Sequence, residues 1–358
     1  MRINRDQLLE ALEVVKPGLA SKELIEQTTS FAFLDGMVVT YNDEISISHP
    51  VEGIEFEGAI KAKELYGLLN RIDKKVVSLS ISDEGTELLF NAGRIRSGLR
   101  LETDIKLPID EFNVEGAEWK EIKNPSQLRN SIALCAETCA TDMSRLKLTC
   151  VDIKNNGVIQ GSDGFRFLQC LGEALPFTDD EFLLPAHNAV EVSKFEFSSI
   201  MVDKGWVHFK NEDVGSIFSC RFIEEEYVDQ NIIENVVQFE DPILLPFPKK
   251  MIKMIDLVGQ FAERKYIMDE KVDVIIEDGH IMLKAETEDT KSWVKNVAAI
   301  DTEEKLSFSL TPSLFKNILL LSGHCSINPK RTKIKFSMEI GGDYSWCYVI
   351  MLRDPKTD

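Results

Sequence analysis

The sequence predicts an α+β fold made of three tandem copies of one unit, each with two helices over an antiparallel sheet. Two observations predict this fold. Tight-turn dipeptides recur at intervals of about 120 residues, and apolar stripes with helical spacing recur in phase with them. A chain of 358 residues, 44% of them hydrophobic, is long enough for several cores, since a single core usually stops growing below that size.

The turn signals are Asp35-Gly36, Asn156-Gly157 and Asp278-Gly279. Such dipeptides favour the positive φ angles of a two-residue β-hairpin turn. Strand-like apolar runs flank each dipeptide, which predicts one hairpin in each copy. The flanking runs are Phe31-Ala32-Phe33 with Met37-Val38-Val39, residues 148–153 with Val158-Ile159, and residues 272–276 with 281–283.

One helix is predicted before each hairpin and another after it. Apolar side chains at i, i+4 and i+7 lie on one face of a helix, which can then pack on a sheet. The stripes before the hairpins are Leu8, Leu12 and Val15; Leu128, Ile132, Cys135 and Cys139; and Met251, Ile255, Val258 and Ala262. The stripes after them are Leu65, Leu68, Leu69 and Ile72; residues 186–195; and Leu314, Phe315, Ile318 and Leu319. Prolines, which are favoured in a first helical turn, mark the starts at Pro125, Pro185, Pro248 and Pro312.

Each copy therefore reads as helix, strands, helix, strands, an order that suits helices packed on one face of a sheet. The predicted domains are residues 1–118, 119–240 and 241–358. Three unrelated α+β domains of similar size are the alternative interpretation. The same order of elements in all three copies favours the repeat.

The net charge of −19 argues against a protein that wraps nucleic acid with its whole surface, because phosphate binding needs clustered Lys and Arg. Contact with DNA through one restricted face stays open, and so does no contact at all. No apolar run reaches the length of a membrane span, and the N-terminus is unlike a secretory signal. Seven cysteines without a CxxC pair suit a reducing cytoplasm.

We expect no catalytic site, no metal and no cofactor. The five histidines form no metal-spaced pair, and the chain lacks glycine-rich phosphate loops and a nucleophile elbow. Asp163 and Arg166 could form an active-site pair, but a carboxylate that stabilises a turn is the simpler interpretation. An enzyme with an unrecognised site stays an alternative, which titratable groups converging in a deep polar cleft would indicate.

Four segments give the chain a resemblance to bacterial-type DNA sliding clamps, in order along nearly its whole length. Residues 161–167 (Gly-Ser-Asp-Gly-Phe-Arg-Phe) resemble the Thr-Asp-Gly-His-Arg-Leu motif of the family's middle domain. Residues 348–353 (Tyr-Val-Ile-Met-Leu-Arg) resemble its C-terminal Tyr-Val-Val-Met-Pro-Met-Arg-Leu. Residues 182–186 resemble the approach to the middle domain's second helix, and residues 107–112 the end of the first domain.

The resemblance implies a ring in which two subunits, each of three clamp domains, close head to tail around duplex DNA. It implies a processivity factor without a catalytic site, whose partners are a replicative DNA polymerase, a clamp loader and a second copy of the chain. A heterologous contact whose rotation closes gives a ring rather than a filament. Pairing of sheet edges across subunits would also remove the hazard of exposed edges. The expected location is the cytoplasm, without membrane contact.

The resemblance also implies a pocket for short partner peptides between the second and third domains. Carried over by position, its residues are Leu146, Ser162, Gly164, Phe165, Arg166, Phe167, Val349 and Met351. Leu146 aligns only with a one-residue gap. The alternative is that the phenylalanines are ordinary strand residues and the tail is an ordinary closing strand. Phe165 and Phe167 replace the family's His and Leu, and the tail lacks its proline, which suggests a divergent or phage-encoded clamp.

Basic residues in or beside the helices are the candidates for sequence-independent contact with DNA phosphates. They are Lys22, Lys61, Lys63, Arg71, Lys74, Lys75, Arg129, Lys249, Lys250 and Lys253. Lysines near helix ends also serve the helix dipole or solubility, which is the plain alternative. Asp6, Glu10 and Glu13 make the first helix acidic rather than basic.

The main rival is a protein of the same fold that binds peptides but no longer loads on DNA, as a scaffold or an inhibitor. A clamp should form a closed dimer that stays on circular DNA and slides off linear DNA. A scaffold or inhibitor should not be retained on either, so the two interpretations make different predictions.

Overall fold

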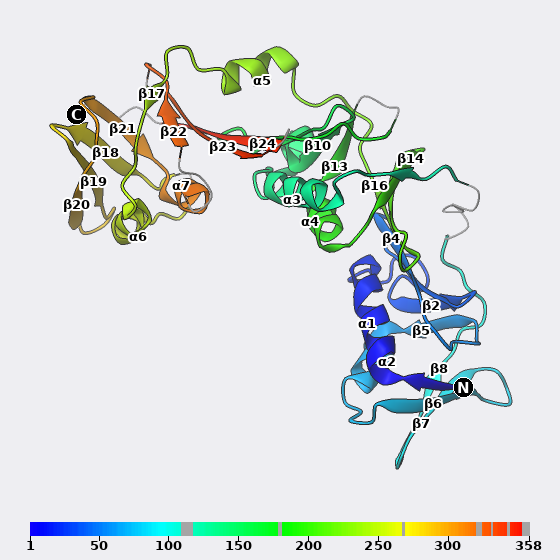
Figure 1. Cartoon of the computed structure of the whole chain (residues 1–358). Helices are drawn as coiled ribbons and strands as arrows, with labels where there is room; N and C mark the ends of the chain where they lie inside the picture. The colour runs from blue at the N-terminus through cyan, green and yellow to red at the C-terminus, as the bar shows by residue number, and fades with distance from the viewer. Residues whose placement is uncertain are drawn as a thin grey trace. The chain divides into compact units, whose positions relative to one another are not determined.

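The computed structural model describes residues 1–108, 117–177, 181–266, 269–319, 324–330, 332–341 and 344–352. The chain falls into two compact units (Figure 1). Unit 1 is Met1–Ala133 with Leu175–Glu224, and unit 2 is Leu134–Ala174 with Glu225–Asp358. Two parts of the motifs that carry the resemblance, residues 109–112 and Arg353, lie outside the described residues.

Unit 1 contains two antiparallel sheets, and α1 and α2 lie side by side in it (Figure 1). The strand orders are β1-β6-β7-β8 and β5-β2-β3-β4-β16-β15-β14-β9. Its first part contains β1 (Arg2–Asn4), α1 (Arg5–Val15), η1 (Lys16–Gly18), β2 (Ser30–Leu34), β3 (Met37–Tyr41), β4 (Ile45–Pro50), β5 (Gly58–Lys61), α2 (Ala62–Leu69), β6 (Val76–Ile81), β7 (Glu87–Ala92) and β8 (Ile95–Arg100). Its second part contains β9 (Lys120–Glu121), the start of α3 (Pro125–Ala136), β13 (Glu181–Pro185), α4 (Ala186–Lys194), β14 (Ser199–Asp203), β15 (Trp206–Asn211) and β16 (Ser216–Arg221).

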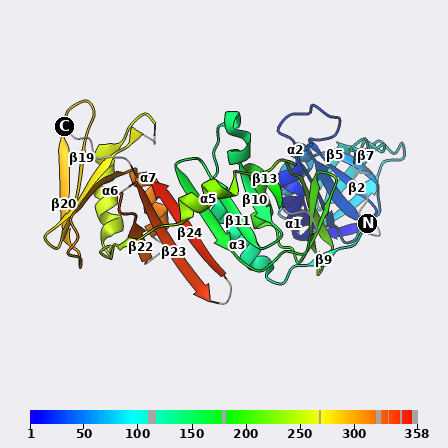
Figure 2. The same ribbon diagram turned by 90° about the horizontal axis from the view of Figure 1, so that it is seen from above.

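Unit 2 has the same construction, with α6 packed against α7 and a long β23–β24 hairpin (Figure 2). Its strands pair in the orders β10-β11-β12-β24-β23-β22-β17 and β20-β19-β18-β21. After the end of α3 come η3 (Met143–Thr149), β10 (Cys150–Lys154), β11 (Val158–Ser162), β12 (Arg166–Leu171), α5 (Gln230–Val237) and β17 (Ile243–Leu244). They are followed by α6 (Met251–Ala262), β18 (Val272–Glu277), β19 (His280–Glu286), β20 (Trp293–Ala299), β21 (Leu306–Leu310), α7 (Pro312–Leu319), β22 (His324–Ile327), β23 (Lys333–Gly341) and β24 (Tyr344–Met351).

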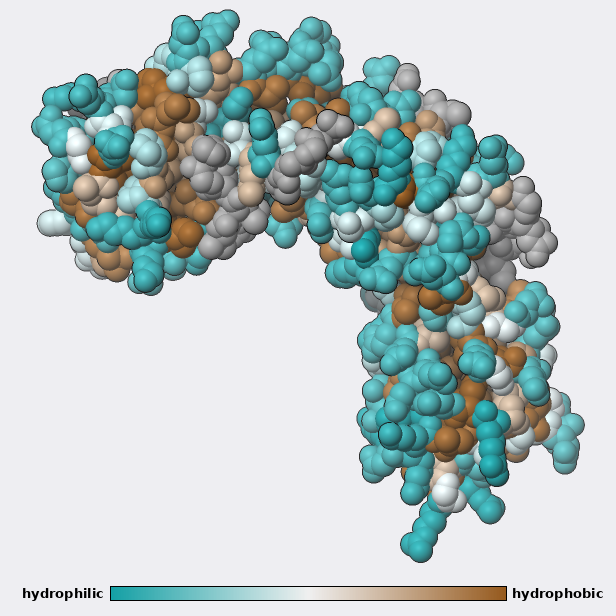
Figure 3. All heavy atoms as spheres, in the orientation of Figure 1, coloured by the Kyte–Doolittle hydropathy of each residue, from teal (hydrophilic) through white to brown (hydrophobic). Residues whose placement is uncertain are grey.

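The predicted helical stripes face the cores. Leu8, Leu12 and Val15 of α1 are at most 1% exposed, and the stripe residues of α3 and α6 are buried too. Hydrophilic side chains cover most of the visible face, with hydrophobic groups between them (Figure 3). One start needs correction: α6 begins at Met251 rather than at Pro248, because Met251 N–H first bonds to the Pro248 carbonyl oxygen (2.8 Å) in a turn.

Two of the three predicted hairpin turns have the expected geometry. Both residues have positive φ in Asp35-Gly36 (49° and 73°) and in Asp278-Gly279 (48° and 71°). The prediction for Asn156-Gly157 is wrong in detail, since only the glycine has positive φ (87°) and its N–H bonds to the Lys154 carbonyl oxygen (3.1 Å). A Cβ atom at this glycine would lie 2.3 Å from the Gly172 carbonyl oxygen, so a side chain does not fit there.

Sheets continue from one repeat into the next at two places. In unit 1, β4 of the first repeat pairs with β16 of the second, and in unit 2, β12 of the second repeat pairs with β24 of the third. One half of the middle repeat therefore shares a sheet with the first repeat and the other half with the third. This continuity explains why the two compact units divide the middle repeat. The domain boundaries at residues 118 and 240 stay a prediction.

Both junctions have the same register. Ser48 faces Ile217 in unit 1, and Gln169 faces Cys347 in unit 2. Ser48 pairs with Val39, three residues after Gly36, and Gln169 pairs with Gln160, three residues after Gly157. Ser48 and Gln169 therefore hold equivalent positions. Ile217 and Cys347 are equivalent because each lies five residues before a backbone N–H that bonds just beyond the strand. These bonds run from Phe222 N–H to the Gly205 carbonyl oxygen and from Leu352 N–H to the Thr332 carbonyl oxygen. Both junctions between repeats therefore use the same strand register.

His208 on β15 is a buried histidine that makes the stability of unit 1 depend on pH. It is 4% exposed, and its Nδ1 lies 2.7 Å from Ser219 Oγ. Burial lowers its pKa to about 4, against a smaller opposing effect of Asp203. The unfolded chain takes up this proton near pH 6.5 and the folded protein only near pH 4, so stability is lost as the pH falls through this window. We expect this group to lower the free energy of unfolding by about 2 kcal/mol between pH 7.5 and pH 5, measured by urea denaturation.

The matched variant for this measurement is His208→Gln, which removes the proton but keeps a side chain that can bond to Ser219. It should lose about 2 kcal/mol less than the parent protein over the same pH range. Burial also lowers the pKa of His49, which affects both proteins alike and cancels in the comparison. Equal losses in the two proteins would contradict the assignment to His208.

Candidate functional site

Unit 2 contains an apolar pocket of about 250 Å³. Four segments form its wall: the end of η3, the turn between β11 and β12, the chain leading into and through α5, and the end of β24. Because all four belong to unit 2, the pocket lies within one compact unit. Its lining consists of Leu148, Ser162, Gly164, Phe165, Arg166, Phe167, Tyr227, Val228, Ile232, Ile233, Val236, Val349 and Met351.

The turn between β11 and β12 is held by its own side chains. Ser162 Oγ donates to the Arg166 carbonyl oxygen (2.7 Å) and accepts from Gly164 N–H (3.0 Å). Asp163 accepts from the backbone N–H groups of Phe165 (2.9 Å) and Arg166 (3.0 Å), and from Arg166 Nε (2.9 Å). Gly164 has a φ of 88°, a conformation that favours glycine. The carboxylate and the guanidinium therefore brace a turn, which leaves the Phe165 side chain 41% exposed at the pocket rim.

The pairing of β12 with β24 brings the chain end to this turn. Val349 lies opposite Phe167 and is 1% exposed. Two residues later, Met351 N–H donates to the Phe165 carbonyl oxygen (2.8 Å), while the Met351 side chain is 44% exposed. Two large apolar side chains, from Phe165 and Met351, thus stand at the rim on backbones that are bonded to each other.

The polar groups of the pocket do not suit catalysis. Its lining has no His, Cys, Lys, Asp or Glu side chain. Burial raises the pKa of the Tyr227 phenol well above its usual range, and Arg166 is engaged with Asp163 and donates to the Glu137 carbonyl oxygen (2.7 Å). No group in this lining can therefore exchange a proton easily at neutral pH, whereas apolar side chains of a ligand could fill the cavity.

The part of the chain that the structure describes shows neither a metal-binding cluster nor a membrane-spanning helix. No group of three or more His, Cys, Asp or Glu side chains there could hold a metal ion. Among the same residues, no helix is both long enough and apolar enough to cross a membrane.

Comparison with known proteins relates the chain to solved structures. No family model matches the sequence, and neither does any curated protein. A DnaN sliding clamp (DNA polymerase III subunit beta) from Pseudomonas aeruginosa, bound to griselimycin, has a TM-score of 0.81 at 16% identity, with 99% of each chain covered. The DNA polymerase sliding clamp from Bacillus subtilis has a TM-score of 0.80 at 17% identity, covering 99% of this chain and 98% of that one. The beta subunit of DNA polymerase III from Thermotoga maritima has a TM-score of 0.78 at 17% identity, with 99% of each chain covered.

The chain has the sliding-clamp fold. The likeness covers nearly all of the chain, so it confirms the predicted α+β fold with three clamp domains. The low sequence identity agrees with the divergence that the altered motifs suggested.

Within the clamp fold, seven of the eight residues predicted for the pocket come together in its lining. They are Ser162, Gly164, Phe165, Arg166, Phe167, Val349 and Met351. Leu146 needs correction, because it does not line the pocket and Leu148 does. η3 is kinked at Arg145 (φ −117°, ψ 59°), and a 3-10 turn has about three residues. Side chains two positions apart there point in different directions.

α5 was not among the helices predicted from the repeated apolar stripes, which gave two helices for each repeat. The residues missed there are Tyr227, Val228, Ile232, Ile233 and Val236. A signal was present: Asp229 is a capping residue type, and its side chain accepts from Asn231 N–H (2.7 Å). The apolar residues that follow have the spacing of one helix face.

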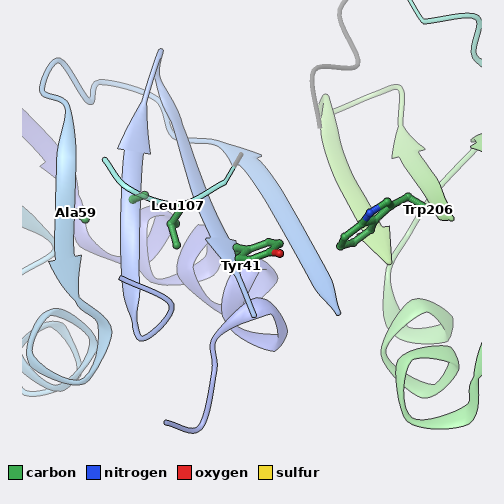
Figure 4. Close-up of a cluster of buried hydrophobic side chains, with 5 residues drawn as sticks. Tyr41, Ala59, Leu107 and Trp206 are labelled. Atoms are coloured by element: carbon green, nitrogen blue, oxygen red, sulfur yellow. The ribbon is translucent and has the colours of Figure 1, made fainter. Parts of the chain in front are cut away.

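The position equivalent to the pocket in unit 1 is filled by the chain's own side chains. Tyr41 and Arg221 stand where the pocket has Ser162 and Met351, as judged from the shared register. Tyr41 is buried in a cluster with Trp206, and the two rings point toward one another (Figure 4). A large aromatic side chain here replaces the small hydroxyl of the pocket.

Polar contacts lock this filled junction. The Arg221 guanidinium lies over the Trp206 ring, 4.6 Å from its centroid, and 3.6 Å from Asp43 Oδ1. The same carboxylate oxygen accepts from the Tyr41 hydroxyl (3.1 Å). The chain thus contains two equivalent junctions, and the position of the apolar pocket is closed by these side chains in unit 1 and open in unit 2.

The ten basic candidates for DNA contact lie on both units of the clamp fold. Eight of them are exposed: Lys22, Lys63, Arg71, Lys74, Lys75, Lys249, Lys250 and Lys253. Lys61 is half-buried and pairs with Glu23 (2.5 Å), and Arg129 is half-buried beside Glu196 (3.8 Å). These two side chains already have acidic partners within the chain.

Three of the exposed lysines stand at the start of α6. Lys249 precedes the helix, Lys250 is its N-cap residue, and Lys253 lies in its first turn. The N-terminal end of a helix carries a partial positive charge, which disfavours cations. Stabilisation of the helix dipole therefore does not explain these lysines.

Proposed function

We propose that this protein is a DNA sliding clamp: two copies close head to tail around duplex DNA and hold a replicative DNA polymerase through a short peptide bound in the apolar pocket. A clamp loader opens the ring, and the chain itself catalyses no reaction. The supporting observation is that two sheet edges, in the first and third repeats, have the same positions as the edges already joined within the chain. The protein acts in the cytoplasm, where it meets replicating DNA.

The edges in question are β8 and β20, each at one end of a four-stranded sheet whose other end is β1 or β21. Judged from the hairpin positions, β8 is the counterpart of β16 and β24, and β20 is the counterpart of β4 and β12. Each internal junction joins one strand of the first kind to one of the second. The same rule applied between two copies pairs β8 of one with β20 of the other. Such a head-to-tail contact can close into a ring and covers both edges.

The internal register predicts which residues meet between the copies. Val297 and Arg96 hold the positions of the residues that face each other in both internal junctions. The same register sets Val294 against Leu99. The faces agree, because Leu99 is 8% exposed and faces a core, whereas Val297 is 43% exposed and faces outward. A register shifted by one residue would set a core face against a solvent face.

Contact with DNA is supported by where the negative charge lies. The whole chain carries −19, but the six helices other than α5 contain six basic and six acidic residues between them. The acidic excess therefore lies outside these six helices. Helices without net charge can face a duplex. A ring that is retained by topology needs few phosphate contacts, and many such contacts would slow sliding.

The experiment that tests the proposal combines native mass with retention on DNA. We expect a dimer near twice the chain mass of 40.6 kDa. After loading by the clamp loader of the same source, it should stay on nicked circular plasmid through gel filtration. Cutting the plasmid once should release it, because a ring slides off a free end.

Each outcome of this experiment decides between the candidate functions. Peptide binding without retention on the circle would favour a scaffold or inhibitor of the same fold, and release that does not depend on a free end would reject encirclement. The variant Lys249→Glu/Lys250→Glu/Lys253→Glu should keep the dimer mass but leave the circle sooner. Unchanged residence would remove these lysines from the DNA-contacting set.

A further inference from the structure

Two lysines of β23 hold the C-terminal end of α5. Lys335 Nζ donates to the Val237 carbonyl oxygen (3.1 Å). Lys333 Nζ donates, at 2.5, 3.2 and 3.4 Å, to the carbonyl oxygens of Asn235, Val236 and Gln238. Four successive carbonyl groups at the end of the helix thus receive hydrogen bonds from two ammonium groups.

These contacts matter because α5 is short. It has eight residues, and an isolated helix of fewer than about 12 residues is marginal in water. The last carbonyl groups of a helix lack partners within it and attract cations. Both ammonium groups also lie over the Phe239 ring, 5.0 and 5.1 Å from its centroid. The two lysines therefore supply a cap that the helix cannot form from its own backbone.

The capped helix is one wall of the pocket. Ile232, Ile233 and Val236 line the cavity, and the Val236 carbonyl oxygen is itself one of the acceptors of Lys333. Neither lysine is among the lining residues. Burial and the neighbouring Lys335 lower the pKa of Lys333, so its ammonium group is partly withdrawn from water beside the helix end. A change at these lysines would reach a bound ligand only through the position of α5.

We infer that Lys333 and Lys335 are positioning residues, which fix α5 as a wall of the pocket and thereby set the affinity for the partner peptide. The inference rests on the proposed function of the pocket. Without the cap, α5 loses charge-assisted hydrogen bonds at one end and samples positions in which Ile233 and Val236 no longer close the cavity. The peptide must then order the helix as it binds, which weakens binding.

The test compares the full-length protein with the variant Lys333→Met/Lys335→Met, which keeps the aliphatic stems and removes the donors. The probe is a fluorescein-labelled peptide from the C-terminus of the replicative polymerase of the same source, followed by fluorescence anisotropy. We expect roughly tenfold weaker binding, faster hydrogen exchange of the α5 amides and an unchanged dimer mass. The variant Lys333→Arg/Lys335→Arg, which keeps the donors, should restore both binding and protection.

Lys330→Met is the matched control. Lys330 is an exposed lysine of the turn before β23, and the hydrogen bonds to the end of α5 come from Lys333 and Lys335. It should leave affinity and exchange unchanged. If the parent protein does not bind the peptide, the proposed function fails, while the exchange data still test the cap. If the parent binds and the methionine variant binds equally well, the inference is overturned. Weaker binding with unchanged exchange of α5 would overturn it as well.

Discussion

The Ser97→Cys/Asn296→Cys variant should form a covalently closed dimer when it is oxidised. If the two copies meet in the register shared by both internal junctions, Ser97 of one copy should lie opposite Asn296 of the other. Opposed residues of antiparallel strands have Cα atoms about 4.5–5.5 Å apart, and a disulfide spans about 4.4–6.8 Å. Two bridges should therefore form in each ring, and non-reducing electrophoresis with native mass would detect them.

The control for this variant moves one thiol along β8 and leaves the other in place. Ile95→Cys/Asn296→Cys places the first thiol on the same face of β8 but two residues away, about 6.6 Å along the strand. The native cysteines should not compete, because six are buried and Cys347 is half-buried. Cross-linking of the control alone would show a shifted register. Cross-linking of neither would show that β8 and β20 do not meet, and the ring proposal would fall with it.

The covalent ring should also behave differently on DNA. Once loaded on circular plasmid and oxidised, it should stay through washes at about 1 M salt, where phosphate contacts are screened. Reduction should restore the shorter residence of the parent protein, and a single cut in the plasmid should release both. Retention that depends on closure and not on salt would mean that topology, rather than affinity, holds this protein on DNA.

The helices and most hairpins could be predicted because their signals lie within a few residues of each other. The stripe of α6 is buried as its spacing required, and Asp278-Gly279 forms the expected turn. Boundaries were less certain, since Pro248 enters a turn before α6 rather than its first position. Asn156-Gly157 shows the same limit, because a three-residue connection uses the same residue types as a two-residue one.

The junctions between repeats could not be predicted from local patterns. β12 and β24 are far apart in the sequence, and no local pattern in either strand identifies the strand with which it pairs. The motif resemblance brought most of the pocket together, but it could not follow η3 through its kink to Leu148. It also passed over α5, whose apolar face stands among acidic residues. Packing, and not periodicity, decides which face of so short a helix is covered.

Loss of two rim side chains should remove the binding of polymerase peptides. In the variant Phe165→Ala/Met351→Ala we expect affinity for the labelled polymerase peptide to fall at least about 100-fold, because large apolar side chains that contact a partner can each contribute about 2 kcal/mol or more. Both side chains are more than two-fifths exposed, so their loss should change the free energy of unfolding by less than about 0.5 kcal/mol. The backbone bond between Met351 N–H and the Phe165 carbonyl oxygen survives the change.

The matched control is Leu171→Ala/Met338→Ala. Leu171 is 41% exposed and Met338 is 37% exposed, they lie on strands of the same sheet, and neither lines the pocket. This variant removes a similar apolar surface from unit 2 and should bind the peptide as the parent does. Equal losses in both variants would mean that the peptide adheres to exposed apolar surface in general. Full binding by the rim variant would place the peptide elsewhere, because both Phe165 and Met351 line this cavity.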